Sequence, residues 1–338
     1  MKAALFQGPN KIEVKEIEKP KIQKGEALIK ISYAGICGTD LHIFKGKHPR
    51  AQAPLVMGHE FSGVIEKIDA NQTDLKVGDR VVVNPLLPCG HCLVCQEGKI
   101  HLCPNLNLIG IDRDGAFAEY TKADINRMIK IPNSLSMEIA ALAEPVAVAV
   151  HAVKKAQLSV GDKVVVMGGG PIGQLVAQIC KLSGASPVVL SEISPERIVF
   201  AQKMGLITAN SKDDTINKVK ELIRKEGADI VFEAVGVQST YDYITEIIRP
   251  DGKIVAVGAA SGPIAVDFWK LFFNELNIIG IHVYDQNAFE IAIQLLNKYP
   301  DLFRHFVSRV IGYDNLQKEF ESLAKGNASV MKILVKNE

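Results

Sequence analysis

The chain has 338 residues, which at about 150 residues per domain predicts two domains. Hydrophobic residues make up 47% of the chain and charged residues 23%, the balance of a globular protein with a sizeable core. Lys and Arg (39) nearly equal Asp and Glu (38) and aromatic residues are only 6%, so composition argues against a nucleic-acid partner or an anionic membrane surface.

Cysteine usage and hydropathy give the expected compartment. No stretch approaches about 18 apolar residues without a charge or a glycine cluster, so we expect no membrane span. The apolar run at the N-terminus is too short for a signal peptide. Four of the six cysteines lie between Cys89 and Cys103, a distribution typical of a metal site rather than of a disulfide scaffold. The expected location is therefore the cytoplasm.

The first part of the chain, residues 2–131, reads as short strands separated by Gly, Pro and Asp turns, which predicts a compact, mostly β unit. The clearest strands are 27–31, 61–68 and 80–83. Near Met137 the apolar period lengthens, and residues 137–155 are predicted to form one helix despite Pro145.

Beyond residue 160 apolar strands alternate with helices, which predicts a parallel, doubly wound sheet. The predicted strands are 163–167, 187–190, 228–232 and 253–257, and helices are expected at 172–182 and from Pro195. The apolar segment 276–281 fits either an edge strand or an interior strand. The tail, 283–338, offers two helices and two strands.

A glycine-rich turn follows the strand 163–167. Gly168, Gly170 and Gly173 fit G-x-G-x-x-G, and Pro171 and Ile172 open the helix that follows. The glycines allow a tight turn, close approach of a pyrophosphate and close packing of helix on strand, while the helix N-terminus offers free N–H groups to phosphate. This context predicts a dinucleotide-binding site.

An acidic residue completes this fingerprint. Glu192 lies about 20 residues after the last glycine, at the end of the next predicted strand. A carboxylate there accepts hydrogen bonds from ribose hydroxyls and repels a 2′-phosphate, so the sequence predicts NAD rather than NADP. Arg197 is the competing signal, because a nearby arginine can bind that phosphate; we interpret it as a cover for the adenine or ribose.

The strongest motif is a run of four cysteines at short spacing. Cys89, Cys92, Cys95 and Cys103 match a tetrahedral, closed, structural zinc site made of thiolates alone. The alternatives are two disulfides, which a reducing compartment disfavours, and an iron–sulfur cluster, whose usual spacings differ.

A second set of metal-type ligands is dispersed along the chain. Its members are Cys37, His59, Glu60 and Glu144, and each alone fits burial, a satisfied core imidazole or a surface charge. The short sequence motifs in which they lie indicate that they belong together. These motifs are G-I-C-G-T-D-L-H from Gly35, G-H-E from Gly58, and Glu144 followed by proline.

On these motifs the chain resembles the zinc-dependent medium-chain dehydrogenases, the superfamily of alcohol, polyol and threonine dehydrogenases. The resemblance implies an α/β architecture: a GroES-like β-rich catalytic domain, residues 1–148, completed by 283–338, and a Rossmann NAD-binding domain, residues 149–282, with the active site in the cleft. It implies one catalytic and one structural zinc ion and a homodimer or homotetramer.

The resemblance also implies roles for single residues. Cys37 and His59 match two catalytic zinc ligands, and Glu60 matches a glutamate that ligates zinc directly or lies beside it. Glu144 stands where the polyol branch has a glutamate that holds zinc or its water. The other matches are Asp40, which orients the histidine, and Thr39 and His42, which relay the hydroxyl proton to solvent.

The implied reaction is oxidation of a secondary alcohol to a ketone, with hydride transfer to NAD. Glu144-Pro145 favours a polyol, sugar alcohol or sugar acid as substrate. Threonine dehydrogenases share the start of the cysteine motif but characteristically have aspartate before that proline, so L-threonine is the alternative substrate. A non-enzymatic NAD-binding sensor is the rival class, and it predicts a broken ligand set.

Overall fold

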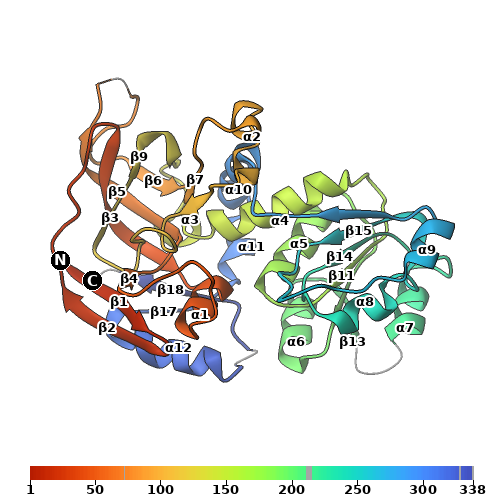
Figure 1. The fold of residues 1–338 in the computed structure, drawn as a ribbon. Helices are drawn as coiled ribbons and strands as arrows, with labels where there is room; N and C mark the ends of the chain where they lie inside the picture. The colour runs from red at the N-terminus through yellow and green to blue at the C-terminus, as the bar shows by residue number, and fades with distance from the viewer. Residues whose placement is uncertain (72, 211–214, 327–328, 337–338) are drawn as a thin grey trace. The chain divides into compact units, whose positions relative to one another are not determined.

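The protein folds into two compact units in a computed structural model, which describes residues 1–71, 73–210, 215–326 and 329–336. One unit combines Met1–Glu144 with Asp285–Glu338, and the other is Pro145–Tyr284. Figure 1 shows a β-rich first unit, to which the first and the last segments of the chain both contribute, and a second unit of strands and helices in alternation.

A seven-stranded sheet forms the centre of the first unit, in the order β10-β6-β5-β3-β18-β17, with β9 also paired to β3. Its strands are β3 Glu26–Gly35, β5 Glu60–Asp69, β6 Arg80–Val83, β9 Tyr120–Asp124, β10 Met128–Lys130, β17 Val307–Ile311 and β18 Lys332–Lys336. Beside it lie a three-stranded sheet and a two-stranded one. Their strands are β1 Lys2–Gly8, β2 Lys11–Glu16 and β4 Leu55–Val56, then β7 Leu86–Leu87 and β8 Asn107–Leu108. The predicted strands 27–31, 61–68 and 80–83 are confirmed as β3, β5 and β6.

The tail of the chain belongs to this unit. Phe320 of the tail packs against Phe44 and Phe117, with ring centroids 5.2 and 6.3 Å apart, so the tail shares the aromatic core of residues 1–144. The described part of the tail contains three α-helices rather than the two predicted, because the helical stretch near 300 is divided at Tyr299 and Pro300 is the first residue of a new helix. The helices of this unit are α1 Gly38–Phe44, α2 Leu93–Gln96, α3 Met137–Ala140, α10 Gln286–Lys298, α11 Pro300–Arg304 and α12 Leu316–Ala324.

The single helix predicted for 137–155 is wrong. The structure has α3 and then α4, Ala143–Ala156, with a turn between them. Pro145 explains the division: it has no N–H to donate, so it fits the first turn of a helix, where no intrahelical acceptor is required, and not an interior. The new start places Glu144 in the first turn of α4.

The second unit contains a six-stranded, fully parallel sheet in the order β13-β12-β11-β14-β15-β16. Its strands are β11 Val164–Met167, β12 Val188–Glu192, β13 Ile207–Asn210, β14 Ala228–Glu233, β15 Ile248–Ala256 and β16 Asn277–Gly280. Its further helices are α5 Pro171–Leu182, α6 Pro195–Lys203, α7 Thr215–Leu222, α8 Gln238–Ile244 and α9 Phe268–Phe273. The predicted doubly wound sheet is confirmed, and the apolar segment 276–281 holds an edge strand, β16.

Buried strands form the core of this unit. Val165, Val189 and Val231, from three neighbouring strands, are all fully buried, as expected when helices cover both faces of a parallel sheet. The carboxyl ends of β11 and β12 are therefore held in fixed register, with Met167 opposite Ser191. The glycine-rich turn and Glu192 follow directly from these two ends.

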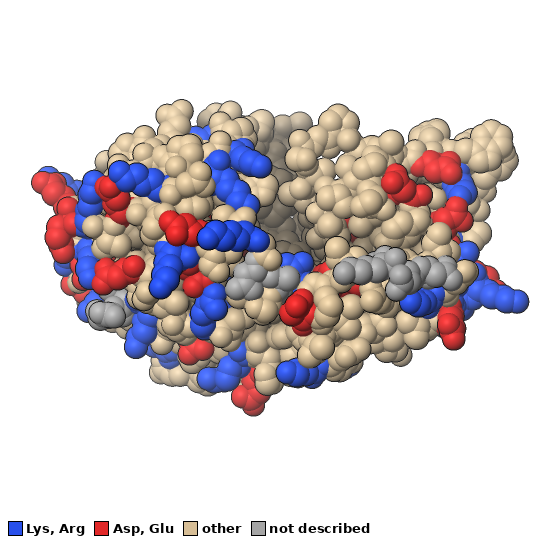
Figure 2. Space-filling model, turned by 90° about the horizontal axis from the view of Figure 1, so that it is seen from below, with Lys and Arg blue, Asp and Glu red and all other residues tan. Residues whose placement is uncertain are grey.

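The surface bears both signs of charge. Figure 2 shows Lys and Arg interspersed with Asp and Glu on one face, in keeping with the net charge of +1. None of the helices in the described parts of the chain combines the length and the hydropathy that crossing a bilayer requires.

Candidate metal and nucleotide sites

Strand register brings together the first group of predicted metal ligands. β3 and β5 are antiparallel, with Gly35 opposite Glu60. Cys37 follows the end of β3 and His59 precedes the start of β5, so both lie at the same end of the strand pair. Each of Cys37, His59 and Glu60 offers one ligand atom, and these three atoms lie within 4.8 Å of one another. A soft thiolate, an imidazole and a carboxylate form the donor set of a catalytic zinc site, so these residues fit the implied metal.

Asp40 lies behind this group. It is fully buried in the first turn of α1, and its Oδ2 accepts a hydrogen bond from the Cys37 N–H at 2.9 Å. Its Oδ1 lies 3.5 Å from His59 Nδ1, and both of these buried atoms lack a hydrogen bond in the described structure. The Asp40 carboxylate thus faces the Nδ1 side of the His59 ring, opposite to Nε2.

Charge at His59 follows from the same contacts. Burial lowers the pKa of this imidazole, but the Asp40 carboxylate and the Cys37 sulfur outweigh burial and raise the pKa well above its usual range. The pocket therefore favours positive charge at this position, which is the electrostatic character that a metal cation requires.

Thr39 and His42 lie on α1, which Cys37 precedes directly. They are three residues apart and so share a face of the helix. Thr39 is half-buried and His42 is exposed, a sequence of burial that suits proton passage from an inner site to water.

Glu144 is buried, with 7% of its surface exposed. It is not a member of the Cys37–His59–Glu60 group, which has three members among the residues the structure describes. Its charge nevertheless acts on the same region, because it contributes to the raised pKa of the Lys332 ammonium.

Lys332 is the site residue that sequence reasoning missed. It starts β18, and its Nζ lies 2.7 Å from both carboxylate oxygens of Glu60. The contact joins residues 272 positions apart, so no local motif could indicate it. A signal did exist: a lysine inside the apolar run 330–335 must find a partner if that strand is buried.

The four clustered cysteines also converge. The sulfur atoms of these residues lie within 4.8 Å of one another; the residues are Cys89, Cys92, Cys95 and Cys103. Cys92 and Cys95 sulfurs are 3.3 Å apart, well beyond the S–S bond of about 2.05 Å, and all six cysteines are free, so the disulfide alternative is not formed here.

Protonation in this lobe is uneven. N–H groups of His91 and Cys92 lower the pKa of the Cys89 thiol to about 6, whereas burial and the Cys92 sulfur raise the pKa of Cys95 to about 12. Four sulfurs this close cannot all be thiolates without a cation, so the arrangement fits a structural zinc ion.

The glycine-rich turn has the geometry predicted for phosphate binding. Gly168 has a φ of +98°, and a Cβ on Gly173 would collide with the Gly168 carbonyl oxygen, so α5 can lie on β11 only with glycine there. Gly170 is the N-cap of α5 and has no side-chain cap, which leaves the helix N-terminus free for an anion. Pro171 and Ile172, both half-buried, form its first turn.

Glu192 ends β12 and is buried. Its Oε2 accepts the Gly169 N–H at 2.6 Å, and its Oε1 accepts N–H groups of Ile193 and Ser194 at 2.6 and 2.9 Å. Arg197 lies 3.6 Å from the same carboxylate. Glu192 is thus locked beside the glycine-rich turn. Three of the about four lone-pair sites of its carboxylate accept these N–H groups, so about one is left for a ligand hydroxyl.

Comparison with known proteins agrees with this geometry. Two family models match the chain: "Alcohol dehydrogenase GroES-like domain" over residues 23–133 and "Zinc-binding dehydrogenase" over residues 171–298. The chain is 37% identical to 2-dehydro-3-deoxy-L-galactonate 5-dehydrogenase of Pseudoalteromonas atlantica, and the match covers 99% of this chain and 98% of that protein.

Two further likenesses bear on the substrate. L-threonine 3-dehydrogenase of Shewanella putrefaciens is 33% identical, over 92% of each chain. The crystal structure of 2R,3R-butanediol dehydrogenase from Bacillus subtilis has a TM-score of 0.93 and 32% identity, and the match covers 100% of this chain and 99% of that one. Because the motifs, the fold and these full-length matches agree, the chain belongs to the zinc-type medium-chain alcohol dehydrogenase family, in its polyol branch.

Proposed function

We propose that this protein is an NAD-dependent zinc dehydrogenase that oxidises a secondary alcohol of a polyol, sugar alcohol or sugar acid to a ketone. The convergence of Cys37, His59 and Glu60 donor atoms within 4.8 Å carries the proposal, because these atoms come from two separate segments of the chain. The galactonate-type relative acts on a sugar acid and the butanediol enzyme on a diol, which supports this substrate class.

In this proposal Cys37 and His59 hold the catalytic metal, and Glu60 and Glu144 complete its surroundings. Zinc there would supply Lewis-acid polarisation of a hydroxyl group, which lowers the pKa of that hydroxyl. Asp40 fixes the His59 ring, Thr39 accepts the hydroxyl proton, and the exposed His42 passes that proton to solvent. Cys89, Cys92, Cys95 and Cys103 hold a second, structural zinc ion.

NAD is the proposed hydride acceptor. Free N–H groups at the start of α5 would bind the pyrophosphate, and Glu192 would accept the ribose hydroxyls. Arg197 lies against the Glu192 carboxylate, so its charge is already compensated and a 2′-phosphate gains less from it. This arrangement supports NAD over NADP.

The proposal extends to organisation and location. We infer a GroES-like catalytic domain, 1–148 with 283–338, a Rossmann domain, 149–282, and a homodimer or homotetramer. A cytoplasmic location is proposed because the six free cysteines suit a reducing compartment.

The test is spectrophotometric. The purified protein should reduce NAD with vicinal diols, sugar alcohols or sugar acids, and a chelator that strips the catalytic metal should stop the reaction. His59→Ala should lower kcat/KM at least about a thousandfold, whereas the matched control His305→Ala, an exposed histidine, should behave as wild type.

L-Threonine is the second candidate substrate, favoured by the 33% identity with a threonine dehydrogenase. It belongs in the same panel. NAD reduction with threonine and with none of the polyols or sugar acids would replace the first proposal by this one. NAD binding without reduction of NAD by any substrate would indicate a sensor.

A further inference from the structure

Lys332 is the one buried lysine or arginine among the residues that the structure describes. Its side chain is 5% exposed, and that of its partner Glu60 is 1% exposed. The ammonium uses all three of its donors: Glu60 Oε1 and Oε2 at 2.7 Å each, and the Ile36 carbonyl oxygen at 3.2 Å. One cation therefore ties the Glu60 carboxylate to the backbone residue that precedes Cys37.

The backbone around this contact is equally constrained. β18 pairs with the end of β3, with Leu334 opposite Gly35, and the Ile36 N–H donates to the Ile333 carbonyl at 2.9 Å. A Cβ on Gly35 would collide with Glu60 Oε2, so the carboxylate occupies the space that this glycine leaves. Glu60 is thus held between Gly35 and Lys332.

Lys332 is surrounded by anionic groups. Besides Glu60, the Cys37 sulfur and the Glu144 carboxylate interact electrostatically with the ammonium. Two of these groups, Glu60 and the Cys37 sulfur, offer ligand atoms within 4.8 Å of each other. A metal bound there and the Lys332 ammonium would consequently draw on the same carboxylate oxygens.

We propose that Lys332 is a positioning residue that competes with the catalytic metal for the Glu60 carboxylate, and so limits how strongly Glu60 can act as a metal ligand. This inference rests on the proposed function, since it assumes a metal at Cys37 and His59. Its physical basis is that an oxygen that accepts a 2.7 Å charge-assisted hydrogen bond has less electron density to offer a cation. A weak Glu60 leaves a coordination position open to substrate.

Competition for Glu60 and a purely structural role predict opposite changes in metal affinity when Lys332 is removed. If Lys332 only supported the fold, its loss would loosen the site and weaken metal binding. If it competes for Glu60, its loss frees the carboxylate, which then binds the metal more fully. The metal should be held more tightly, and its coordination number should rise.

The experiment compares wild type with Lys332→Met, Lys332→Arg and the double variant Lys332→Met/Glu60→Gln. Co²⁺ replaces the catalytic metal after chelator treatment that leaves the four-cysteine site filled, and metal analysis verifies one Co²⁺ and one Zn²⁺ per chain. Co²⁺ affinity is measured by competition with a chelator, and coordination number by the intensity of the visible d–d bands. Lys332→Gln, which keeps a donor amide, takes the place of Lys332→Met if that protein does not fold.

In Lys332→Met we expect Co²⁺ affinity about tenfold higher than in wild type, with weaker d–d bands because five-coordinate Co²⁺ absorbs less than four-coordinate Co²⁺. The double variant should lose both effects, and Lys332→Arg should retain the wild-type spectrum. If Lys332→Met binds Co²⁺ with unchanged or lower affinity and keeps the wild-type spectrum, the proposed role of Lys332 is overturned and the proposed function is not affected. A wild-type chain that takes up no metal beyond the four-cysteine site would overturn both this inference and the proposed function.

Discussion

Three buried charged or titratable side chains of this protein each face a specific partner. Glu192 accepts three backbone N–H groups, His59 faces Asp40, and Lys332 faces Glu60. Because an unpaired buried charge costs several kcal/mol, these pairs mark positions where the fold sets the charge and orientation of one side chain. The candidate sites are built at these positions.

At the scale of single residues, we predict that Glu192 determines the preference for NAD over NADP. Glu192→Ala should lower kcat/KM for NAD by about tenfold or more, because ribose hydroxyls lose their acceptor, and should improve use of NADP, because Arg197 is released to meet the 2′-phosphate. Steady-state kinetics with both cofactors measure this. Glu196→Ala, an exposed glutamate on the neighbouring helix, is the control. An unchanged ratio of the two kcat/KM values would exclude Glu192 as the selector.

Short sequence motifs are enough to predict some site residues but not others. Cys37, His59 and Glu192 stand in short motifs whose strand and turn context the sequence also supplies. Lys332 has no such motif, because its role exists only once β18 lies beside β3. Contacts between residues far apart in sequence depend on strand order, which a single sequence does not determine.

At the scale of elements, apolar runs predicted strands better than helix boundaries. The second unit follows the predicted alternation of strands and helices, since a strand buried on two faces must be continuously apolar. The helix over 137–155 was wrong because apolar spacing continues across the turn before α4, and only the rule for Pro145 indicates where the new helix begins.

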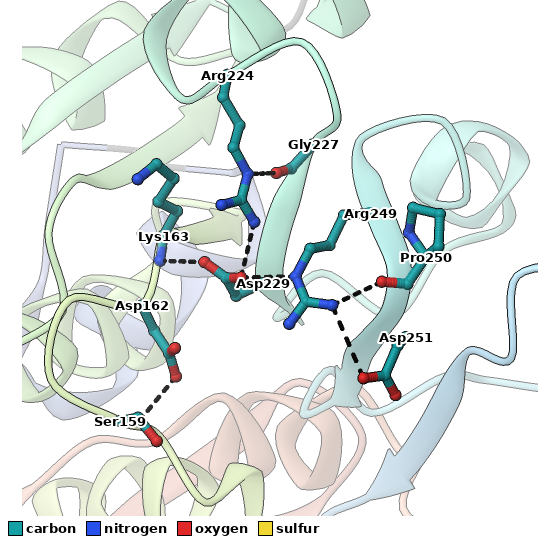
Figure 3. Close-up of polar contacts among 9 residues, drawn as sticks. All are labelled: Ser159, Asp162, Lys163, Arg224, Gly227, Asp229, Arg249, Pro250 and Asp251. Atoms are coloured by element: carbon teal, nitrogen blue, oxygen red, sulfur yellow. Dashed lines mark hydrogen bonds and ion pairs between the residues drawn. The ribbon is translucent and has the colours of Figure 1, made fainter.

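Two strands and two connecting segments of the second unit meet at Asp229. Figure 3 shows Arg224 and Arg249 pointing toward its carboxylate, each 2.7 Å from Oδ1, while the Lys163 N–H donates to Oδ2 at 2.7 Å. Burial alone would raise the pKa of Asp229, but these donors lower it below its usual range. The cluster thereby joins β14 and the start of β15 to the residue that precedes β11.

Asp229→Asn should therefore lower the free energy of unfolding by about 2 kcal/mol at neutral pH. Because the folded pKa lies below the unfolded value of about 3.9, the stabilisation is complete above that pH and disappears as pH falls through the folded pKa. Urea unfolding of both proteins from pH 7 to pH 3 checks this. Asp251→Asn, an exposed partner of Arg249 at 3.9 Å, should change stability little. A difference between wild type and Asp229→Asn that stays constant down to pH 3 would contradict the assignment.

At the scale of the whole molecule, the second unit exposes an apolar edge. β16 ends the parallel sheet with one side unpaired in the described structure, and α9 just before it exposes Trp269 at 72% and Phe272 at 66%. Trp269 and Phe273 rings pack 4.3 Å apart on the same helix. An exposed edge strand beside exposed aromatic residues is a surface that monomers rarely keep, which supports the proposed oligomer.

The corresponding prediction concerns mass in solution. Wild type should have at least twice the monomer mass of 36.8 kDa by light scattering. The double variant Trp269→Ser/Phe272→Ser should dissociate toward monomers at micromolar concentration, since exposed aromatic residues supply much of the energy of an interface. The control is Leu93→Ser, an exposed apolar residue of the other unit. A wild-type monomer would refute the oligomer.

The position of β18 has a consequence for biosynthesis. Cys37 and His59 are synthesised long before the strand that pairs with β3 and delivers Lys332. Until then β3 lacks β18 as its neighbouring strand, and the Glu60 carboxylate lacks its partner Lys332. The candidate metal site can accordingly be completed only once β18 has been made and has paired with β3, because only then does Glu60 meet its counter-ion Lys332.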